Sequence, residues 1–106
     1  MLINIWQMEM NEKTRAYIFE GYEKYKKRSG KSGMMPEDYS LVFTGDIGAK
    51  DLDDVFMIFN TKCVEGFIGH SLSVSDLVEV VDGEDKGLWY CDLFGWVKTH
   101  WSNADE

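Results

Sequence analysis

Few residues in this chain have the types and spacing that catalysis requires. His70 stands beside serines and an aspartate in the segment 69–76, GHSLSVSD. The members of a Ser-His-Asp triad come together from separate segments, whereas these residues are neighbours in the sequence. Hydroxyl and imidazole groups in such a loop more often bond to nearby backbone groups. We therefore interpret His70 and the serines as loop-forming residues and expect no enzymatic activity.

Ligands for a metal ion are also few. The cysteines and histidines are Cys63, His70, Cys91 and His100, and their spacing lacks the CxxC pairs that are typical of zinc sites. The chain has neither of the glycine-rich motifs that bind nucleotide phosphates. The sequence therefore predicts no metal and no cofactor, and both thiols are expected to be reduced.

Acidic side chains dominate the charge. The 106 residues include 19 acidic and 11 basic side chains, which give a net charge of −8. Residues 1–31 are net basic, and residues 32–106 carry most of the acids. An excess of negative charge repels nucleic acids and membranes and attracts basic protein surfaces. The alternative is that this charge serves solubility alone.

The length fits a single domain over residues 1–106. The longest apolar run, 55–59, is far shorter than the roughly 20 residues that a membrane helix needs. The first residues lack the basic region of a secretory signal, so a cytoplasmic protein is expected. Residues 102–106 are expected to form a frayed tail.

The first half of the chain contains two strand patterns around an ambiguous segment. Alternating apolar residues predict a strand over 3–10 that is buried on both faces. For residues 14–28, a short strand at 16–19 followed by a helix at 20–28 is preferred over one continuous helix. Residues 39–44 are rich in β-branched and aromatic side chains and predict a second strand.

The second half begins with the clearest helix, at 52–59. Leu52, Val55, Phe56 and Phe59 recur at helical spacing, and Asp51 is the expected N-cap. Phe56→Asp is therefore expected to unfold the domain. Strands follow at 77–81 and 88–91 around a turn at 82–87, and residues 92–96 continue into 97–101. The predicted fold is α+β, a small, mainly antiparallel sheet of about four or five strands with two packed helices.

Several of these segments resemble the YodL-like domain family of bacterial chromosomes, plasmids and conjugative elements. The most specific are 67–78, FIGHSLSVSDLV, and 90–96, YCDLFGW; the segments 5–8, 38–43 and 52–56 fit the same layout. The chain differs from this family around residues 29–33 and 96–101. The resemblance implies an accessory interaction protein with no catalytic residues to transfer, often carried on mobile genetic elements. One member of the family is associated with the bacterial actin-like cytoskeleton.

Charge and resemblance together suggest a non-enzymatic acidic binding protein. Its concrete form is an anti-CRISPR-type inhibitor, which occupies the basic nucleic-acid-binding surface of a CRISPR effector nuclease; this step is an analogy. The alternative is a regulatory module that binds a host protein, such as the actin-like cytoskeleton, through apolar surface. No direct nucleic-acid binding is expected. The expected contacts are carboxylates and aromatic side chains: Asp53, Asp54, Glu79, Glu84, Asp85, Tyr25, Trp96 and Trp101.

Overall fold

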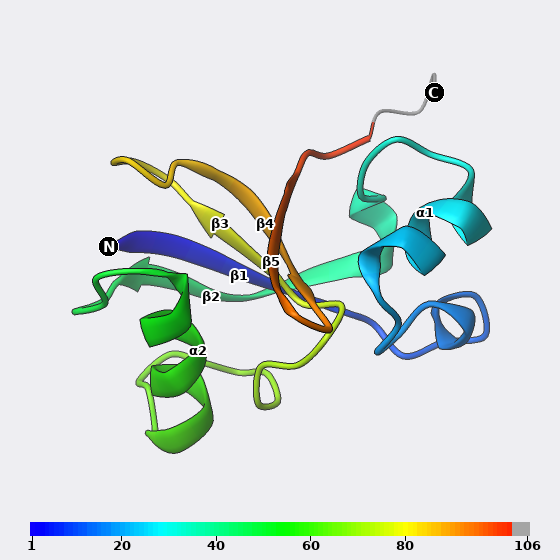
Figure 1. The fold of residues 1–106 in the computed structure, drawn as a ribbon. Helices are drawn as coiled ribbons and strands as arrows, with labels where there is room; N and C mark the ends of the chain where they lie inside the picture. Colours follow the sequence, from blue (N-terminus) through cyan, green and yellow to red (C-terminus); the bar gives the residue numbers. More distant parts are fainter. Residues whose placement is uncertain (103–106) are drawn as a thin grey trace.

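A five-stranded antiparallel sheet forms the centre of the computed structural model, which describes residues 1–102 (Figure 1). The strands are β1 (Leu2–Met8), β2 (Tyr39–Asp46), β3 (Leu77–Val80), β4 (Gly87–Asp92) and β5 (Gly95–Thr99), in the order β2-β1-β3-β4-β5. The helices are α1 (Tyr22–Ser29) and α2 (Leu52–Thr61). This arrangement confirms the predicted α+β fold. Within residues 1–102, neither helix has the length and apolar character needed to cross a membrane.

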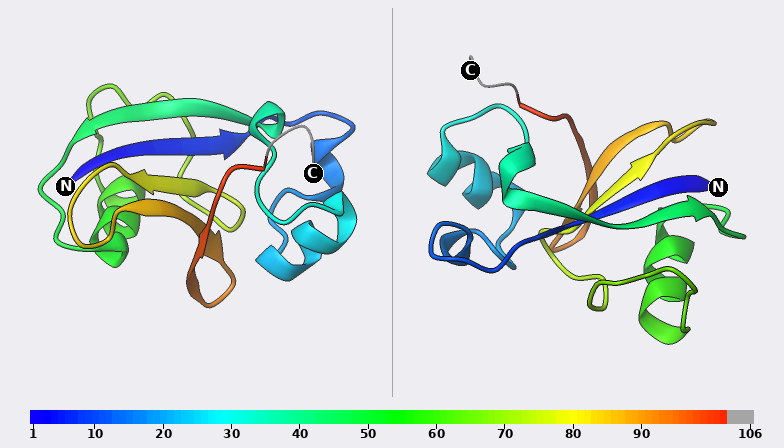
Figure 2. Two further views of the ribbon diagram at one scale, coloured as in Figure 1. Left: turned by 90° about the horizontal axis from the view of Figure 1, so that it is seen from above. Right: turned by 180° about the vertical axis from the view of Figure 1, so that it is seen from behind.

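Strand β1 ends at Met8, short of the predicted residue 10, and only one of its faces is fully buried. On the other face Asn4 and Trp6 are half-buried and Leu2 is exposed, so the predicted burial of both faces is wrong in part. Ile3 and Ile5 pack in a cluster with α2 on one face of the sheet. Met8 points to the other face and packs in a second cluster with Tyr22 and Tyr25 of α1. The two helices therefore cover opposite faces, and they lie toward opposite ends of the sheet (Figure 2).

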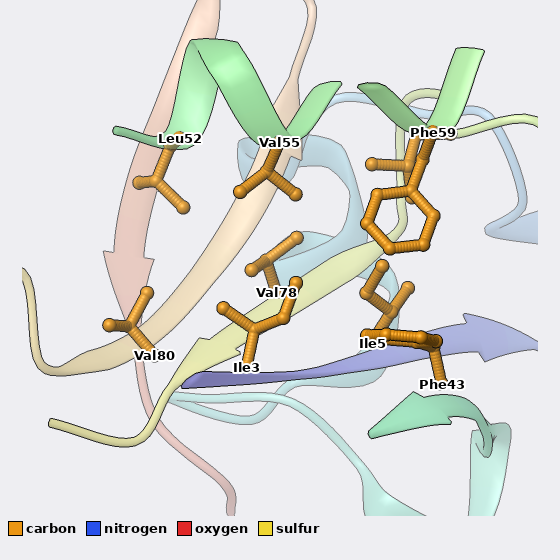
Figure 3. Packing of buried hydrophobic residues seen from close by; sticks show 9 residues of the cluster. Ile3, Ile5, Phe43, Leu52, Val55, Phe59, Val78 and Val80 are labelled. Atoms are coloured by element: carbon orange, nitrogen blue, oxygen red, sulfur yellow. The ribbon is translucent and has the colours of Figure 1, made fainter. Parts of the chain in front are cut away.

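Helix α2 begins at the predicted cap, where the Asp51 carboxylate accepts the Asp54 N–H at 2.8 Å. Three of its apolar side chains project onto β1, β2 and β3 (Figure 3). Phe56 lies to the side of this face and is 39% exposed, so its predicted burial is wrong. Phe56→Asp is consequently not expected to unfold the domain. The buried side chains of α2 are Leu52, Val55 and Phe59.

The segment between β1 and α1 contains a 3₁₀ turn at Thr14–Ala16, and the strand predicted at 16–19 is not formed. The N–H of Asn11 donates to the Thr14 hydroxyl at 3.0 Å, and the N–H of Thr14 donates to the Asn11 side chain at 2.9 Å. These reciprocal bonds close a turn that competes with extended structure. Phe19 then adopts a positive φ of 65°, which is incompatible with a strand. The helix predicted at 20–28 is confirmed as α1.

The chain after β5 is joined to the loop that follows α1. The N–H of Ser102 donates to the Met34 carbonyl at 2.7 Å, and the Ser102 hydroxyl accepts the Gly33 N–H at 2.9 Å. Trp101 and Met34 form a parallel β-bridge. Ser102 is buried, so the fraying expected there is wrong; the rest of the expected tail, 103–106, lies outside the described residues.

Candidate functional site

Carboxylates gather at the end of the sheet where β1 begins. The turn between β3 and β4 and the loop between β2 and α2 both lie at this end, near the N-terminus (Figures 1 and 2). Met1, Lys50 and Glu84 are among the residues that line a hollow of about 280 Å³ between them. We call this region the acidic end. Its carboxylates are Asp46, Asp54, Asp82, Glu84 and Asp85.

The predicted acidic contacts do not all lie at this end. Asp54, Glu84 and Asp85 belong to it, and the Glu84 side chain is exposed. Asp53 is also exposed but lies beside Trp96, away from the β3–β4 turn. Glu79 lies on the face of the sheet opposite α2. Its carboxylate accepts hydrogen bonds from the Asn4 amide at 2.9 Å and from the Trp6 indole at 3.4 Å. The predicted acidic face is therefore divided, and Glu79 is part of the surface network of the sheet.

Tyr25 lies in the core, although it was expected to contact a partner. Its side chain has no exposed surface, and its hydroxyl donates to the Asp38 carboxylate at 3.1 Å. The same hydroxyl accepts the Met35 N–H at 3.2 Å. Burial raises the pKa of the Tyr25 phenol above its usual value. Tyr25 therefore fastens α1 to the loop before β2 and is not available to a partner in this structure.

The two tryptophans that were predicted to contact a partner are half-buried and lie on different faces of the sheet. Trp101 packs edge-on against Trp6, with 5.3 Å between the ring centroids, on the α1 face. Trp96 lies on the α2 face, and its indole N–H donates to the Asp53 carboxylate at 3.3 Å. Among the predicted contacts, the structure thus brings Trp96 and Asp53 together and leaves Trp101 apart from them.

Exposed apolar side chains surround the turn between β4 and β5, a feature that the sequence did not predict. Phe94 is 98% exposed, Leu93 62% and Phe19 53%. Two hollows adjoin Leu93, one of about 500 Å³ that includes Phe19 and one of about 200 Å³ that includes Phe56. We call this region the apolar surface; its residues are Phe19, Phe56, Leu93, Phe94 and Trp96.

The sequence did carry a signal for this turn. Asp at the first position and Gly at the fourth favour a β-turn, and Asp92 and Gly95 have that spacing. The segment that was expected to run on from 92–96 into 97–101 instead reverses, because Asp92 pairs with Gly95. Gly95 adopts a φ of +97°, a backbone conformation that residues other than glycine rarely adopt. The reversal places Leu93 and Phe94 at the tip.

The GHSLSVSD segment is fastened to β1 by Gln7, a residue that sequence reasoning missed. The Gln7 amide N–H₂ donates to the His70 carbonyl at 2.9 Å and to the Asp76 carboxylate at 3.0 Å. Its amide oxygen accepts the His70 N–H at 3.1 Å. A Cβ at Gly69 would lie 2.1 Å from that oxygen, so a larger residue there would displace the Gln7 amide from these bonds. The backbone of His70, more than its imidazole, thus makes the loop-forming bonds.

Asp76 is the buried carboxyl of this network, with 1% exposure. Burial raises its pKa from 3.8 to about 6, although hydrogen bonds from Ser73 and Gln7 and the nearby His70 lower it in part. The folded state therefore binds this proton more tightly than the unfolded chain does. The stabilisation is complete below the unfolded pKa and is lost as the pH rises through about 6.

We predict that Asp76→Asn removes this pH dependence. The free energy of unfolding of the wild type, relative to that of the variant, should fall by about 1–3 kcal/mol as the pH rises from about 4 to about 7. Urea unfolding at a series of pH values measures this difference. A difference that stays constant, or that grows with pH, would contradict the assignment.

Metal-ligand geometry is absent from the described part of the chain. Residues 1–102 hold no group of three or more His, Cys, Asp or Glu side chains that is placed to bind a metal ion. Cys63 is exposed and Cys91 is buried, and both are free thiols. Burial raises the pKa of the Cys91 thiol to about 12, so little reactive thiolate is present near neutral pH.

Comparison with known proteins gave a match at the level of a family model. The model described as the YodL-like domain matches residues 2–101. That range includes every strand and helix of the fold, the acidic end and the apolar surface. No curated protein and no solved structure matches the chain.

Proposed function

The chain belongs to the YodL-like domain family, and from this premise we propose that it is a non-enzymatic binding protein whose acidic end engages a basic surface of another protein. One observation carries this proposal: two loops far apart in the sequence bring their carboxylates to the same end of the sheet. The strands fix both loops, so the negative charge is held in one place. Such a field raises the rate and selectivity of association with a basic partner.

Few cations oppose the carboxylates at the acidic end. The N-terminal ammonium lies 3.0 Å from the Asp46 carboxylate, and Lys50 and Lys86 belong to the two loops. Asp82 and Glu84 project from the turn as exposed side chains. Basic groups of a partner can therefore approach the turn without first displacing an internal ion pair of these two carboxylates.

In its most specific form, the partner is the nucleic-acid-binding surface of an RNA-guided CRISPR nuclease. The chain is then an anti-CRISPR-type inhibitor encoded on a mobile element. Small size and a net charge of −8 support this form, because the channel of such a nuclease is strongly basic. The support is an analogy of size and charge, and inhibition of such a nuclease is the property that decides it.

Reversing two charges at the turn tests the acidic end. We expect Glu84→Lys/Asp85→Lys to raise the concentration needed for half-inhibition by at least about tenfold, which corresponds to about 1.4 kcal/mol of binding free energy. The measurement is target-DNA cleavage by a guide-loaded Cas9-type nuclease in the presence of increasing amounts of the chain. Inhibition by the wild type should weaken as salt rises toward physiological strength.

A matched control reverses the charge of two acidic residues at other positions on the surface. Glu12→Lys/Glu65→Lys alters exposed glutamates outside the acidic end and should leave inhibition intact. Equal losses in the two variants would show a dependence on net charge alone and would reject the acidic end as the contact. No inhibition by the wild-type chain would reject the nuclease as the partner.

A regulatory module that binds a host protein through apolar contacts is the second candidate function. The apolar surface favours it, because exposed aromatic side chains concentrate around the β4–β5 turn. The family resemblance suggests the actin-like cytoskeleton as one such host partner. Under this function, Glu84→Lys/Asp85→Lys leaves host-protein binding unchanged.

A further inference from the structure

We propose that the apolar surface is a docking site for a segment of a partner protein that carries two large apolar side chains flanked by Lys or Arg. The proposal deepens the second candidate function, on which it rests, by giving the partner a chemistry. It is independent of the proposed role of the acidic end. Four observations support it: the exposed turn, the fixed position of Phe19, the paired hollows and the charge of their rim.

The exposed turn places apolar side chains where the fold does not need them. Leu93 and Phe94 occupy the two positions between β4 and β5, where polar residues and glycine are usual. Phe94 is 98% exposed, so it contributes almost nothing to the core. Apolar groups that gather on a surface in this way mark a place that another molecule covers.

Phe19 is held outward by a hydrogen-bonded backbone. Its φ of 65° is unfavourable for a bulky side chain. Its N–H donates to the Ser75 hydroxyl at 3.2 Å, and the next carbonyl, that of Glu20, accepts the Tyr90 hydroxyl at 2.6 Å. These bonds fasten the segment to the core and keep one wall of the larger hollow in place. A wall that is already ordered lowers the entropy cost of binding.

The two hollows share Leu93 as a common wall. The larger one, of about 500 Å³, lies between Phe19 and Phe94. The smaller one, of about 200 Å³, includes Phe56 and Trp96. A single segment that crosses Leu93 can place one apolar side chain in each hollow. Anchor residues in neighbouring pockets are a common way in which short segments bind.

Carboxylates line the rim of both hollows. Glu23 and Asp92 border the larger one, where Lys24 supplies a cation, and Asp53 and Asp92 border the smaller one. Lys or Arg beside the apolar anchors would meet these carboxylates. A second copy of the chain fits the rim poorly, because its own carboxylates and its net charge of −8 would face them. The rim therefore favours a basic partner.

Peptide selection tests this inference. Random short peptides displayed on phage are selected against the wild-type chain, and the enriched sequences are synthesised and measured by fluorescence anisotropy. We expect enrichment of two apolar residues beside Lys or Arg. Phe94→Ser should weaken binding of those peptides by at least about tenfold. Because Phe94 lies outside the core, the melting temperature of this variant should stay at the wild-type value.

Two control variants test whether the peptides bind at the apolar surface. Ile68→Ser removes a side chain that is 80% exposed but does not line either hollow, and it should leave peptide affinity unchanged. Glu84→Lys/Asp85→Lys should also retain peptide binding, so failure of the acidic-end function does not affect this result. Glu23→Lys, at the rim itself, should weaken binding of the basic peptides.

Three outcomes would overturn the proposal. One is no enrichment over background, and another is enrichment of peptides that bind Phe94→Ser as tightly as the wild type. The third is a dimer of the wild type in sedimentation that Phe94→Ser dissociates, because it would assign the apolar surface to self-association.

Discussion

Val55→Asp will unfold the domain, whereas the same substitution at the neighbouring residue, Phe56, will leave it folded. Val55 has no exposed surface and packs between α2 and the sheet (Figure 3). A carboxylate there has no partner, and an unpaired charge in a core costs several kcal/mol. Small domains have a total stability of only about 5–15 kcal/mol. Far-UV circular dichroism and a thermal melt measure the outcome.

Phe56→Asp is the matched control, because it places the same charge on the same helix one residue later. With 39% of Phe56 exposed, the new carboxylate can reach water. We expect a loss of about 1 kcal/mol, which is typical of a partly buried site. Equal unfolding by both variants would mean that α2 meets the sheet through a different face.

Gln7→Ala should have the second largest effect, a loss of about 3–5 kcal/mol in the free energy of unfolding. Gln7 is 3% exposed and bonds to both backbone groups of His70 and to the buried Asp76 carboxylate. Its truncation removes three hydrogen bonds at once, and the buried Asp76 carboxylate keeps only the Ser73 N–H as a donor. Urea unfolding at neutral pH measures the loss.

Asn4→Ala on the same strand is the control for Gln7→Ala. The Asn4 amide also donates to a carboxylate, that of Glu79, at 2.9 Å, but this pair is only partly buried. Its loss should cost about 0.5–1.5 kcal/mol, because water can replace the bond. If the two variants lost equal stability, Gln7 would not be the main fastening of the GHSLSVSD segment.

The sequence predicts the strands and helices in which buried residues recur at the regular spacing of a strand or a helix. Ile3 and Ile5 alternate with the half-buried Asn4 and Trp6 because α2 covers one face of β1 more fully than the other face is covered. The first turn of α2 is set by Asp51 and by apolar spacing. The segment 16–19 has strand-forming residues, yet the bonds between Asn11 and Thr14 turn the chain first. Local propensity failed there because side chains offered the backbone another set of bonds.

The candidate sites were less predictable, since each joins distant segments. Carboxylates at 84 and 85 were expected contacts, but their position beside the β2–α2 loop depends on strand order. Glu79 lies on the opposite face because side chains alternate along β3. The apolar surface draws Phe19, Phe56 and Leu93 from three parts of the chain, so no local pattern reveals it.

The position of β1 between β2 and β3 has a consequence for synthesis on the ribosome. β1 precedes both of its partners in the sequence: it pairs with β2 on one side and with β3, which ends at Val80, on the other. Its second edge therefore has no partner until β3, about 70 residues further along the chain, has been made. An apolar strand with an open edge is prone to pair with other chains, so the nascent protein is most at risk of aggregation during that interval.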